Sequence, residues 1–277
     1  MGIRLAVVGG GRMGEALIGG LLSSGWGSSE ELCVVEKVPA RREQLSGRFP
    51  GLAVVGEVVP ADGVVLAVKP GDVAAACAEV AASGPRRVLS IAAGVTLGTL
   101  EAALGEVAVI RAMPNTAALV RAGAAAISPG VRADEDDLAW AEEILTAVGE
   151  VVRVPESLLD AVTGLSGSGP AYVFLLAESL IDAGVHVGLP HDTSRRLALQ
   201  TLLGAARLLT ETGESPQALR AAVTSPAGTT AAGLRALESA GTRGAVIDAV
   251  VAATARSREL GASPTTPPSP TVPTGLQ

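Results

Sequence analysis

The sequence predicts an α/β fold, in which a doubly wound parallel sheet in the first half of the chain is followed by an all-helical second half. From residue 3 to about residue 152, short β-branched runs alternate with helical patterns, which is typical of a parallel sheet with helices on both faces. After Pro155, apolar residues instead recur at spacings of three and four over long windows, which is the period of a helix.

The elements of the first half follow one another closely. The opening sequence predicts a strand, a helix, a second strand, a second helix and a third strand at residues 3–8, 12–25, 31–36, 39–49 and 51–55. Five more strands are expected at residues 62–68, 86–92, 107–112, 123–128 and 150–154. Because these runs are almost continuously apolar, both faces of the sheet should be buried.

The second half contains four helical windows, at residues 158–184, 191–211, 229–240 and 242–260. Within the first of them, the segment GLSGSGP (164–170) predicts a kink or a close approach of two backbones. The final residues are rich in Pro, Ser and Thr and cannot build a core. We therefore expect a sheet domain over residues 1–154, a helical domain over residues 155–261 and a disordered tail over residues 262–277.

The composition indicates a globular protein without a nucleic-acid or membrane surface. Of the 277 residues 48% are hydrophobic, and the net charge of −7 comes with no basic stripe that would bind phosphates or anionic lipids. The first residues carry no leader pattern, and no apolar run reaches the roughly 18 residues of a membrane span. Cys33 and Cys77 lie in apolar runs at no metal-ligand spacing. We expect a soluble, cytoplasmic protein with buried cysteines.

A glycine-rich loop joins the first strand to the first helix with the spacing GxGxxG, in the context of a Rossmann-type sheet. The first glycine permits the tight turn, the second lets the backbone approach a pyrophosphate, and the third lets helix and strand pack closely. The helix start then offers unpaired amides and the positive end of its dipole to the phosphates. The predicted dinucleotide-binding loop consists of Val8, Gly9, Gly10, Gly11, Arg12, Met13 and Gly14.

The residues after the second strand leave the choice of cofactor open. Glu36 lies 22 residues beyond Gly14, about where an acid in Rossmann folds accepts hydrogen bonds from the adenosine ribose hydroxyls. This position favours NADH. Lys37, Arg41 and Arg42 follow at once, and guanidinium groups in this place are what the 2′-phosphate of NADPH needs. The same three side chains are also compatible with an ordinary solvated helical turn. The sequence therefore predicts a nicotinamide dinucleotide without deciding between NADH and NADPH.

Two more loops follow strands at the carboxyl edge of the sheet, where ligands bind in open α/β folds. In LAVKPGDV, Val68, Lys69 and Pro70 come directly after a strand, and Lys69 is one of only two lysines in the chain, which favours a cofactor contact over an ordinary loop lysine. In RAMPNTAALV, Asn115 should present its amide at the strand end near the nicotinamide.

The segment RAAVTSPAGTTAAGL (220–234) interrupts the helical half and then starts a new helix. Its helix start, at Gly228, Thr229 and Thr230, carries bare amides and hydroxyls, which is a favourable place for an anion. By contrast, His186 and His191 stand at a helix end and a helix start and belong to no cluster with metal-ligand spacing. We expect no metal site.

Four motifs in order, AVKP, MPNT, GLSGSGP and VTSPAGTTAAGLRALE, make the chain resemble the pyrroline-5-carboxylate reductase family over residues 3 to about 260. The resemblance implies a Rossmann domain followed by an all-helical dimerisation domain, with dimers that often assemble into larger rings such as a decamer. It also implies that NAD(P)H reduces 1-pyrroline-5-carboxylate to L-proline. Its implied cofactor contacts are the loop Val8 to Met13, Val68, Lys69 and Ala93, and its implied substrate contacts are Thr229 and Thr230, with Glu156 nearby.

On this hypothesis, the amides of the helix start hold the substrate carboxylate, and the Thr230 hydroxyl bonds the ring nitrogen as the catalytic contact. Glu156 at a helix start is equally well explained as an exposed acid. The chain reads SPAGTT where the family usually reads SPGGTT, and we expect Ala227 to lie in an ordinary backbone region, where the change is harmless.

Three alternative functions are compared with this one. A β-hydroxyacid dehydrogenase needs a catalytic lysine in the helical half, and this chain has no lysine after Lys69. A non-catalytic dinucleotide sensor would use SPAGTT only to cap a helix. A related reductase of another ring size would differ in the dimensions of its pocket, which the sequence does not reveal.

Overall fold

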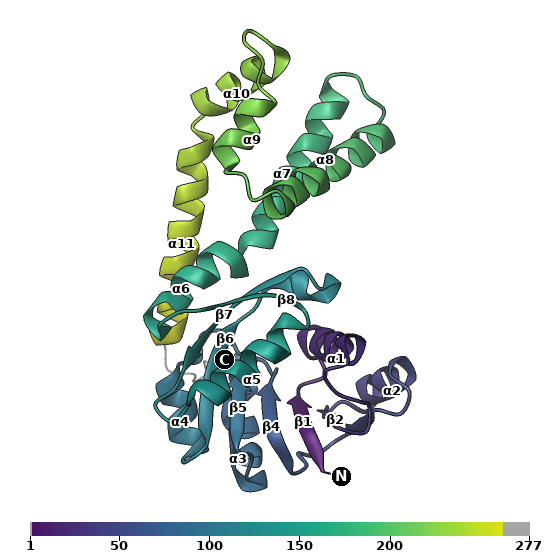
Figure 1. Cartoon of the computed structure of the whole chain (residues 1–277), viewed down its shortest axis with the longest axis vertical. Coiled ribbons are helices and arrows are strands. Elements are labelled where there is room, and N and C mark those ends of the chain that lie inside the picture. The colour runs from purple at the N-terminus through teal and green to yellow at the C-terminus, as the bar shows by residue number, and fades with distance from the viewer. Residues whose placement is uncertain (1, 263–277) are drawn as a thin grey trace, which may run out of the picture. The chain divides into compact units, whose positions relative to one another are not determined.

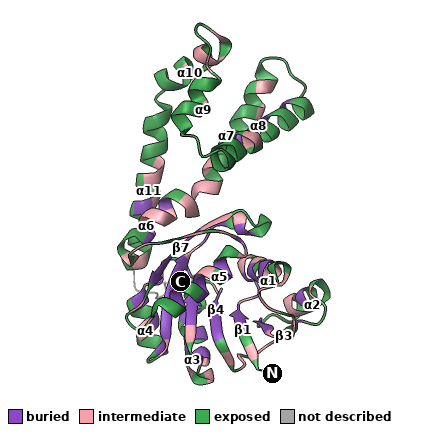
Figure 2. Ribbon diagram, viewed as in Figure 1, coloured by how far each residue is buried: buried purple, intermediate pink, exposed green. Residues whose placement is uncertain are grey.

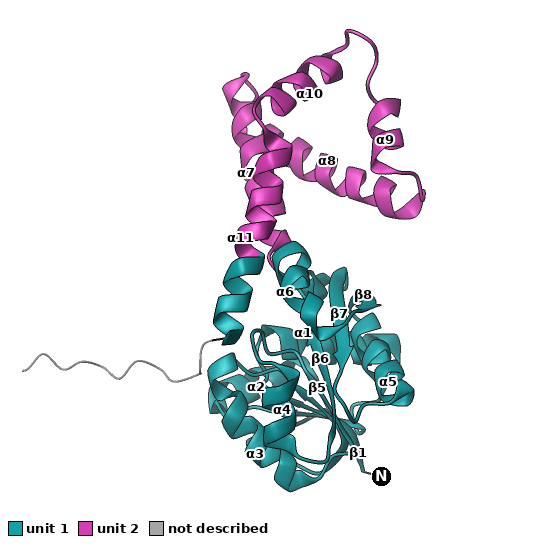
Figure 3. Ribbon diagram, turned by 90° about the vertical axis from the view of Figure 1, so that its left-hand side faces the viewer, with its two compact units in different colours: residues 1–167, 254–277 teal, residues 168–253 magenta. Residues whose placement is uncertain are grey.

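The structure is a computed structural model that describes residues 2–262. It contains two compact units (Figure 3). The sheet unit comprises the chain up to Gly167 together with the part of α11 that begins at Thr254, and the helical unit comprises Ser168–Ala253. The domain boundary at residues 154 and 155 stays a prediction. Apart from Ala262, which is the last residue of α11, the predicted tail at 262–277 lies outside the described residues.

The sheet unit is built on an eight-stranded sheet whose order, within the described residues, is β3-β2-β1-β4-β5-β6-β7-β8. Each of the predicted strand regions overlaps one of these strands, so the predicted α/β fold class is confirmed. The strands are β1 (Ile3–Val8), β2 (Leu32–Val35), β3 (Ala53–Val55), β4 (Ala61–Leu66), β5 (Arg87–Ser90), β6 (Ala108–Met113), β7 (Gly123–Pro129) and β8 (Gly149–Arg153).

The sheet departs from the predicted parallel arrangement at one place, because β7 runs antiparallel to β6, with Arg111 opposite Ser128. A parallel connection needs a crossover of a dozen or more residues, usually a helix. Between β6 and β7 the chain has only residues 114–122, which contain the short 3₁₀ helix Thr116–Val120. The link is too short to cross the sheet, so β7 turns back, whereas β8 again runs parallel to β7 after a full helix.

Helices cover both faces of the sheet, and the alternation of side chains along each strand decides which face they meet (Figure 1). Leu5 and Val7 of β1 pack with α1 (Arg12–Ser24), α2 (Pro39–Arg48) and α5 (Glu135–Thr146). Ala6 and Val8 point the other way and pack with α3 (Val73–Ser83) and α4 (Leu97–Leu104). The doubly wound arrangement thus follows directly from strands that are apolar on both sides.

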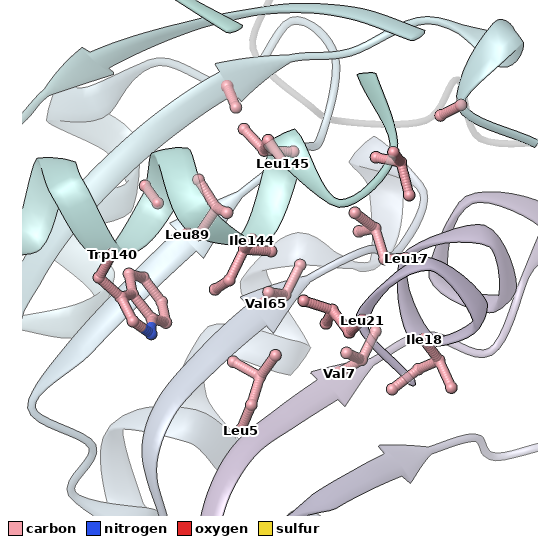
Figure 4. Packing of buried hydrophobic residues seen from close by; sticks show 14 of the residues in the cluster. Leu5, Val7, Leu17, Ile18, Leu21, Val65, Leu89, Trp140, Ile144 and Leu145 are labelled. Carbon is pink, nitrogen blue, oxygen red and sulfur yellow. The ribbon is translucent and has the colours of Figure 1, made fainter. Parts of the chain in front are cut away.

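The larger of the two cores lies under α1 and α5, where the side chains of Leu17, Leu21 and Ile144 meet strand residues (Figure 4). Trp140 closes this core against Gly63, where an added Cβ would come within 2.4 Å of the indole ring. Cys33 and Cys77 are buried, as predicted, and burial raises the pKa of the Cys33 thiol to about 11 and the pKa of Cys77 as well. The strands and inner helix faces form the buried part of this unit (Figure 2).

The helical half contains more breaks than the sequence predicts. The window expected at 158–184 divides into a 3₁₀ turn (Glu156–Leu158), α6 (Leu159–Val162), a π-helical turn (Thr163–Gly167) and α7 (Gly169–His186). The predicted interruption at GLSGSGP is present as the π-helical turn, and a Cβ on Gly167 would lie 2.7 Å from the side-chain Cε atom of Met113. Among the described residues, α8 (His191–Glu211), α9 (Pro216–Ala222), α10 (Thr229–Ser239) and α11 (Thr242–Ala262) follow.

The sequence analysis missed α9, a helix of seven residues. It begins with Ser215 as a cap, whose Oγ accepts a hydrogen bond from the N–H of Ala218 at 3.2 Å, and with Pro216 in the first turn. Serine followed by proline is a recognised signal for a helix start, so local capping could have revealed it. None of the helices in the described part of the chain is long and apolar enough to cross a bilayer.

Candidate dinucleotide and substrate site

A cavity of about 460 Å³ opens at the carboxyl ends of β1, β2 and β4. The chain order reverses between β1 and β4, and such a topological switch point is where open α/β sheets bind ligands. Side chains and backbone from three strand ends and from α3 form its walls. The lining residues are Val8, Gly9, Gly11, Val35, Glu36, Lys37, Val38, Ala67, Val68, Lys69, Asp72, Ala75, Ala76 and Glu79.

The glycine loop has the close contacts that its spacing predicts. Gly9 has a φ of +108°, and a Cβ there would lie 2.5 Å from the carbonyl oxygen of Ala67. A Cβ on Gly14 would lie 2.0 Å from the carbonyl oxygen of Gly9, so the helix packs on the turn only without a side chain. Around Gly11 nothing lies within 4 Å of an added Cβ, and this open space faces the cavity.

The start of α1 adds donors beside the cavity. Gly11 precedes the helix in extended conformation without a side-chain cap, and the first intrahelical bond runs from the N–H of Glu15 to the carbonyl of Gly11 at 2.9 Å. The N–H groups of Arg12, Met13 and Gly14 therefore lie ahead of the helical hydrogen-bond ladder. A glycine cradle, free helical amides and a cavity at the switch point fit the pyrophosphate of a dinucleotide.

The Glu36 carboxylate is held by the backbone at the cavity wall. Its Oε2 accepts a hydrogen bond from the N–H of Gly10 at 3.0 Å, and its Oε1 accepts one from the N–H of Val38 at 2.8 Å. The acid thus fixes the glycine loop to the end of β2. A carboxylate oxygen has room for more than one donor, so the predicted contact with ribose hydroxyls is compatible with both bonds.

The predicted basic side chains near Glu36 bond to the protein itself. Arg41 donates from Nε to the carbonyl of Gly10 at 2.7 Å and also pairs with Glu15. Arg42 donates from Nη1 to the carbonyl oxygens of Glu36 and Lys37 at 2.9 and 3.0 Å. Arg41 thus holds the glycine loop after β1, and Arg42 holds the loop that follows β2.

Lys37 and Glu79 form an ion pair on the cavity wall, and the sequence analysis did not include Glu79 or Asp72 in the site. Asp72, Ala75, Ala76 and Glu79 share one face of the helical segment because they are spaced by three and four residues. This spacing, directly after the predicted contacts at Val68 and Lys69, is the signal that would have found them. Pro70 begins the 3₁₀ turn Pro70–Asp72 that leads into α3.

Two other predicted cofactor residues, Asn115 and Ala93, are not among the described residues that line this cavity. The Asn115 amide is buried, and its Oδ1 accepts hydrogen bonds from the N–H groups of Ala117 and Ala124 at 3.2 Å each. Its Nδ2 donates to the carbonyl of Ser166 at 3.0 Å. Asn115 therefore ties the β6–β7 link to the π-helical turn. Ala93 is exposed on the loop between β5 and α4. The position of Asn115 near the nicotinamide and the contact of Ala93 with the cofactor stay predictions.

Glu156 forms a partly buried junction with a residue that the sequence analysis missed. Its Oε1 accepts from Nη1 of Arg111 at 2.8 Å and from the N–H of Leu97 at 2.7 Å. Arg111 is 8% exposed and comes from β6, while Leu97 is the first residue of α4. The carboxylate thereby fixes the end of the loop that carries Ala93. No local sequence pattern links these three positions, because they are 45 and 59 residues apart.

In the helical unit, α10 begins at Thr229 after Gly228, which is extended and provides no side-chain cap. The first bond into the helix is donated by the N–H of Ala232 to the carbonyl of Gly228 at 3.2 Å. The N–H groups of Thr229, Thr230 and Ala231 precede it. Thr229 is exposed and Thr230 is half-buried. A Cβ on Gly228 would lie 2.3 Å from the Ser225 Oγ, so a larger residue here would have to displace that hydroxyl.

The expectation that Ala227 has ordinary backbone angles is wrong, since its φ is +57°. The N–H of Gly228 donates to the carbonyl of Ser225 at 3.1 Å, which closes a four-residue turn. Proline in the second position and a positive φ in the third are typical of a type II turn, which prefers glycine third. Alanine is therefore strained in this place.

The helical unit exposes much of its apolar surface (Figure 2). The amphipathic helix α8, for example, exposes Leu197, Leu199 and Leu203. His186 and His191 are exposed at the end of α7 and the start of α8, as expected. In the part of the chain that the structure describes, no group of three or more His, Cys, Asp or Glu side chains could hold a metal ion.

These features define the class of protein first: a Rossmann-type dinucleotide-binding protein with an added helical unit. Comparison with known proteins gives the family. Residues 156–260 match the family model described as pyrroline-5-carboxylate reductase dimerisation, and residues 4–94 match that described as NADP oxidoreductase coenzyme F420-dependent. The chain belongs to the pyrroline-5-carboxylate reductase family, as the motifs predicted.

Relatives match over nearly their whole length. The pyrroline-5-carboxylate reductase of Synechocystis sp. is 46% identical, with 94% of this chain and 99% of the relative covered. The solved structure of the Coxiella burnetii enzyme is 37% identical with a TM-score of 0.88, covering 94% of this chain and 99% of that one. The Plasmodium falciparum structure, with NADP bound, is 30% identical with a TM-score of 0.82, covering 94% and 98%.

Proposed function

We propose that this protein reduces 1-pyrroline-5-carboxylate to L-proline with NADH or NADPH, in the last step of proline synthesis. The geometry that carries the proposal is a pair of uncapped helix starts, each behind a glycine. The start of α1 stands beside the cavity and suits a pyrophosphate, and the start of α10 carries Thr229 and Thr230 and suits a small carboxylate. Full-length similarity to pyrroline-5-carboxylate reductases supports it.

The residues that would hold the cofactor are the loop from Val8 to Gly14 together with Glu36, Val68 and Lys69. NAD(P)H supplies the hydride when it is bound. Gly9 and Gly14 keep the turn tight enough for backbone amides to face the phosphates, and Glu36 holds Gly10 in place. Ala93 and Asn115 complete the proposed cofactor contacts, and Glu156 positions the loop of Ala93 through the N–H of Leu97.

The substrate is proposed to bind at α10 through its negative carboxylate. The N–H groups of Thr229, Thr230 and Ala231 and the positive end of the helix dipole attract this group. The Thr230 hydroxyl is proposed to hydrogen-bond the ring nitrogen, which orients the imine carbon. A protonated imine is already electrophilic, so the protein's contribution is a fixed approach of the two reacting carbons. Gly228 keeps the helix start open, and Glu156 near the substrate stays a prediction.

The helical unit is proposed to join two copies of the chain. Its exposed apolar helix faces, such as that of α8, need a cover, and the match to a dimerisation family supports this role. Assembly of dimers into a decamer is a further proposal, which light scattering after size-exclusion chromatography tests. The cytoplasm is the proposed location, and the net charge of −7 favours a small-molecule partner over nucleic acid.

Thr230 provides the central experiment. Thr230→Ala and Thr230→Val should each lower kcat/KM for the imine by roughly tenfold or more, which is the value of one lost hydrogen bond at about 1.4 kcal/mol. Thr230→Ser keeps the hydroxyl and should recover most of the activity. The dissociation constant of NADH should stay the same in all three variants. Equal losses of activity and of NADH binding would contradict the assignment.

Turnover with the five-membered and six-membered ring carboxylates separates the proposed reaction from its alternatives. Faster reduction of the six-membered ring would identify a reductase of another ring size. A protein that binds NADH and oxidises it with neither imine would be a dinucleotide sensor.

A further inference from the structure

The cavity at the end of β2 carries a charge pattern that bears on cofactor choice, an inference that rests on the proposed function. The Glu36 carboxylate is fixed at the wall by the N–H groups of Gly10 and Val38, at 3.0 and 2.8 Å. Both bonds keep this acid at the place where Rossmann-type proteins bind the adenosine ribose. Ribose hydroxyls can donate to its remaining lone pairs, whereas a fully ionised phosphate has no proton to donate.

The nearest cation on this wall is already neutralised. Lys37, directly after Glu36, forms an ion pair with Glu79 of α3. Both residues line the cavity, so their pair joins the β2 side of the cavity to the α3 side. A 2′-phosphate that bound Lys37 would have to displace the Glu79 carboxylate, and it would still lie beside that carboxylate.

The two arginines that follow are engaged in holding the backbone. Arg41 bonds through Nε to the Gly10 carbonyl and through its two terminal nitrogens to Gln44 and Glu15. Arg42 places Nη1 on the carbonyl oxygens at the end of β2. Neither arginine is among the described residues that line the cavity. The lining contains three carboxylates and two ammonium groups, from Glu36, Asp72, Glu79, Lys37 and Lys69.

We propose that this cavity selects NADH over NADPH, with Glu36 and Glu79 as the residues that determine the selectivity. The 2′-phosphate adds about −1.5 to −2 charges at neutral pH, on the scale of other phosphate monoesters. At the end of β2 it meets the carboxylates of Glu36 and Glu79, and the Lys37 ammonium group there is paired with Glu79. NADH instead brings hydroxyls that donate to Glu36. Selectivity is thus a property of these side chains and not of the shared fold.

The test is direct binding, without imine, to the full chain. The dissociation constants of NADH and NADPH are measured by nicotinamide fluorescence at about 20 mM and about 500 mM salt. NADH should bind at least about tenfold tighter at low salt, and the ratio should shrink at high salt because exposed charges are screened. Equal affinities, or tighter binding of NADPH, would overturn the proposal.

A matched pair of variants tests the ion pair. Glu79→Gln frees Lys37 and removes one carboxylate, so the preference for NADH should fall by about fivefold through tighter NADPH binding. Glu150→Gln makes the same change of net charge on the exposed part of β8, at the opposite edge of the sheet from β3, and should leave the ratio unchanged. An equal shift in both variants would contradict a local role of Glu79. Selective NADH binding by a protein that reduces no imine would overturn the proposed function and leave this inference standing.

Discussion

The sheet unit and the helical unit differ in how much of their apolar surface they bury alone. In the sheet unit, apolar side chains from both faces of the strands form two continuous cores, and residues such as Leu5 and Val64 are fully buried. The described residues of the helical unit include only Ala177, Ser194 and Ala198 in the buried class. Their large apolar side chains, such as Phe174 at 63% and Ile247 at 61%, remain exposed.

This contrast shows that the two units, although similar in apolar composition, differ in what covers their apolar surface. A sheet with helices on both faces covers itself, whereas helices with uncovered apolar faces need another surface. Covering such side chains contributes about 25 cal/mol per Å² of buried apolar area towards association. A second copy of the same chain is the partner that the match to a dimerisation family supports.

The largest expected effect comes from a charge on the exposed face of α8. Leu203→Glu should weaken dimerisation by at least about a hundredfold, because a buried unpaired charge costs roughly 3–5 kcal/mol. Light scattering at decreasing protein concentration measures the dimer. Val131→Glu adds the same charge at an 82% exposed valine of the sheet unit and should leave assembly intact. If the Leu203 variant stays dimeric, the α8 face is not the interface.

A substitution in the glycine loop tests the internal packing of the sheet unit. Gly14→Ala should destabilise the sheet unit by roughly 3 kcal/mol, because its Cβ would lie 2.0 Å from the Gly9 carbonyl oxygen. Gly11→Ala, where the space is open, should leave the unfolding midpoint nearly unchanged and weaken NADH binding. Denaturant unfolding and NADH titration separate the two effects. Similar unfolding midpoints for both variants would disprove the packing role of Gly14.

The same contrast explains how much of the fold was predictable. Apolar runs such as IRLAVV predict strands because burial on both faces leaves a local mark in the sequence. The direction of β7 depends instead on the length of the link after Met113, which the pattern of apolar residues does not encode. The first helical window breaks at the glycine-rich segment into α6, a π-helical turn and α7, which its apolar period alone does not predict.

The site was predictable where a motif is local. The predicted loop from Gly9 to Gly14 and the predicted pair Val68 and Lys69 line the observed cavity or shape it, because each lies directly after a strand. The Lys37–Glu79 pair and the junction of Arg111 with Glu156 join positions more than 40 residues apart. Such contacts are set by tertiary packing, and a single sequence gives no spacing rule for them.

The buried thiols make the sheet unit sensitive to alkaline pH. The pKa of Cys33 is raised from 9.0 to about 11 by burial, so the folded state holds its proton where the unfolded state loses it. This contribution is complete below pH 9 and is lost as pH rises towards 11, by about 2–3 kcal/mol. Denaturant unfolding of the wild type and Cys33→Ala at pH 8 and pH 11 measures the difference. An equal loss of stability in both proteins would exclude Cys33 as the cause.

The smallest effect should come from the strained turn before α10. Ala227→Gly should stabilise the helical unit by about 1 kcal/mol or less, because the left-handed conformation costs a non-glycine residue roughly 1–2 kcal/mol and glycine adds entropy to the unfolded chain. Ala236→Gly, inside α10, makes the same chemical change at a helical position and should destabilise by a similar amount. Thermal unfolding of the two variants should therefore shift in opposite directions. If both variants lose stability equally, residue 227 does not need a positive φ, and the turn at Ser225–Gly228 has another shape.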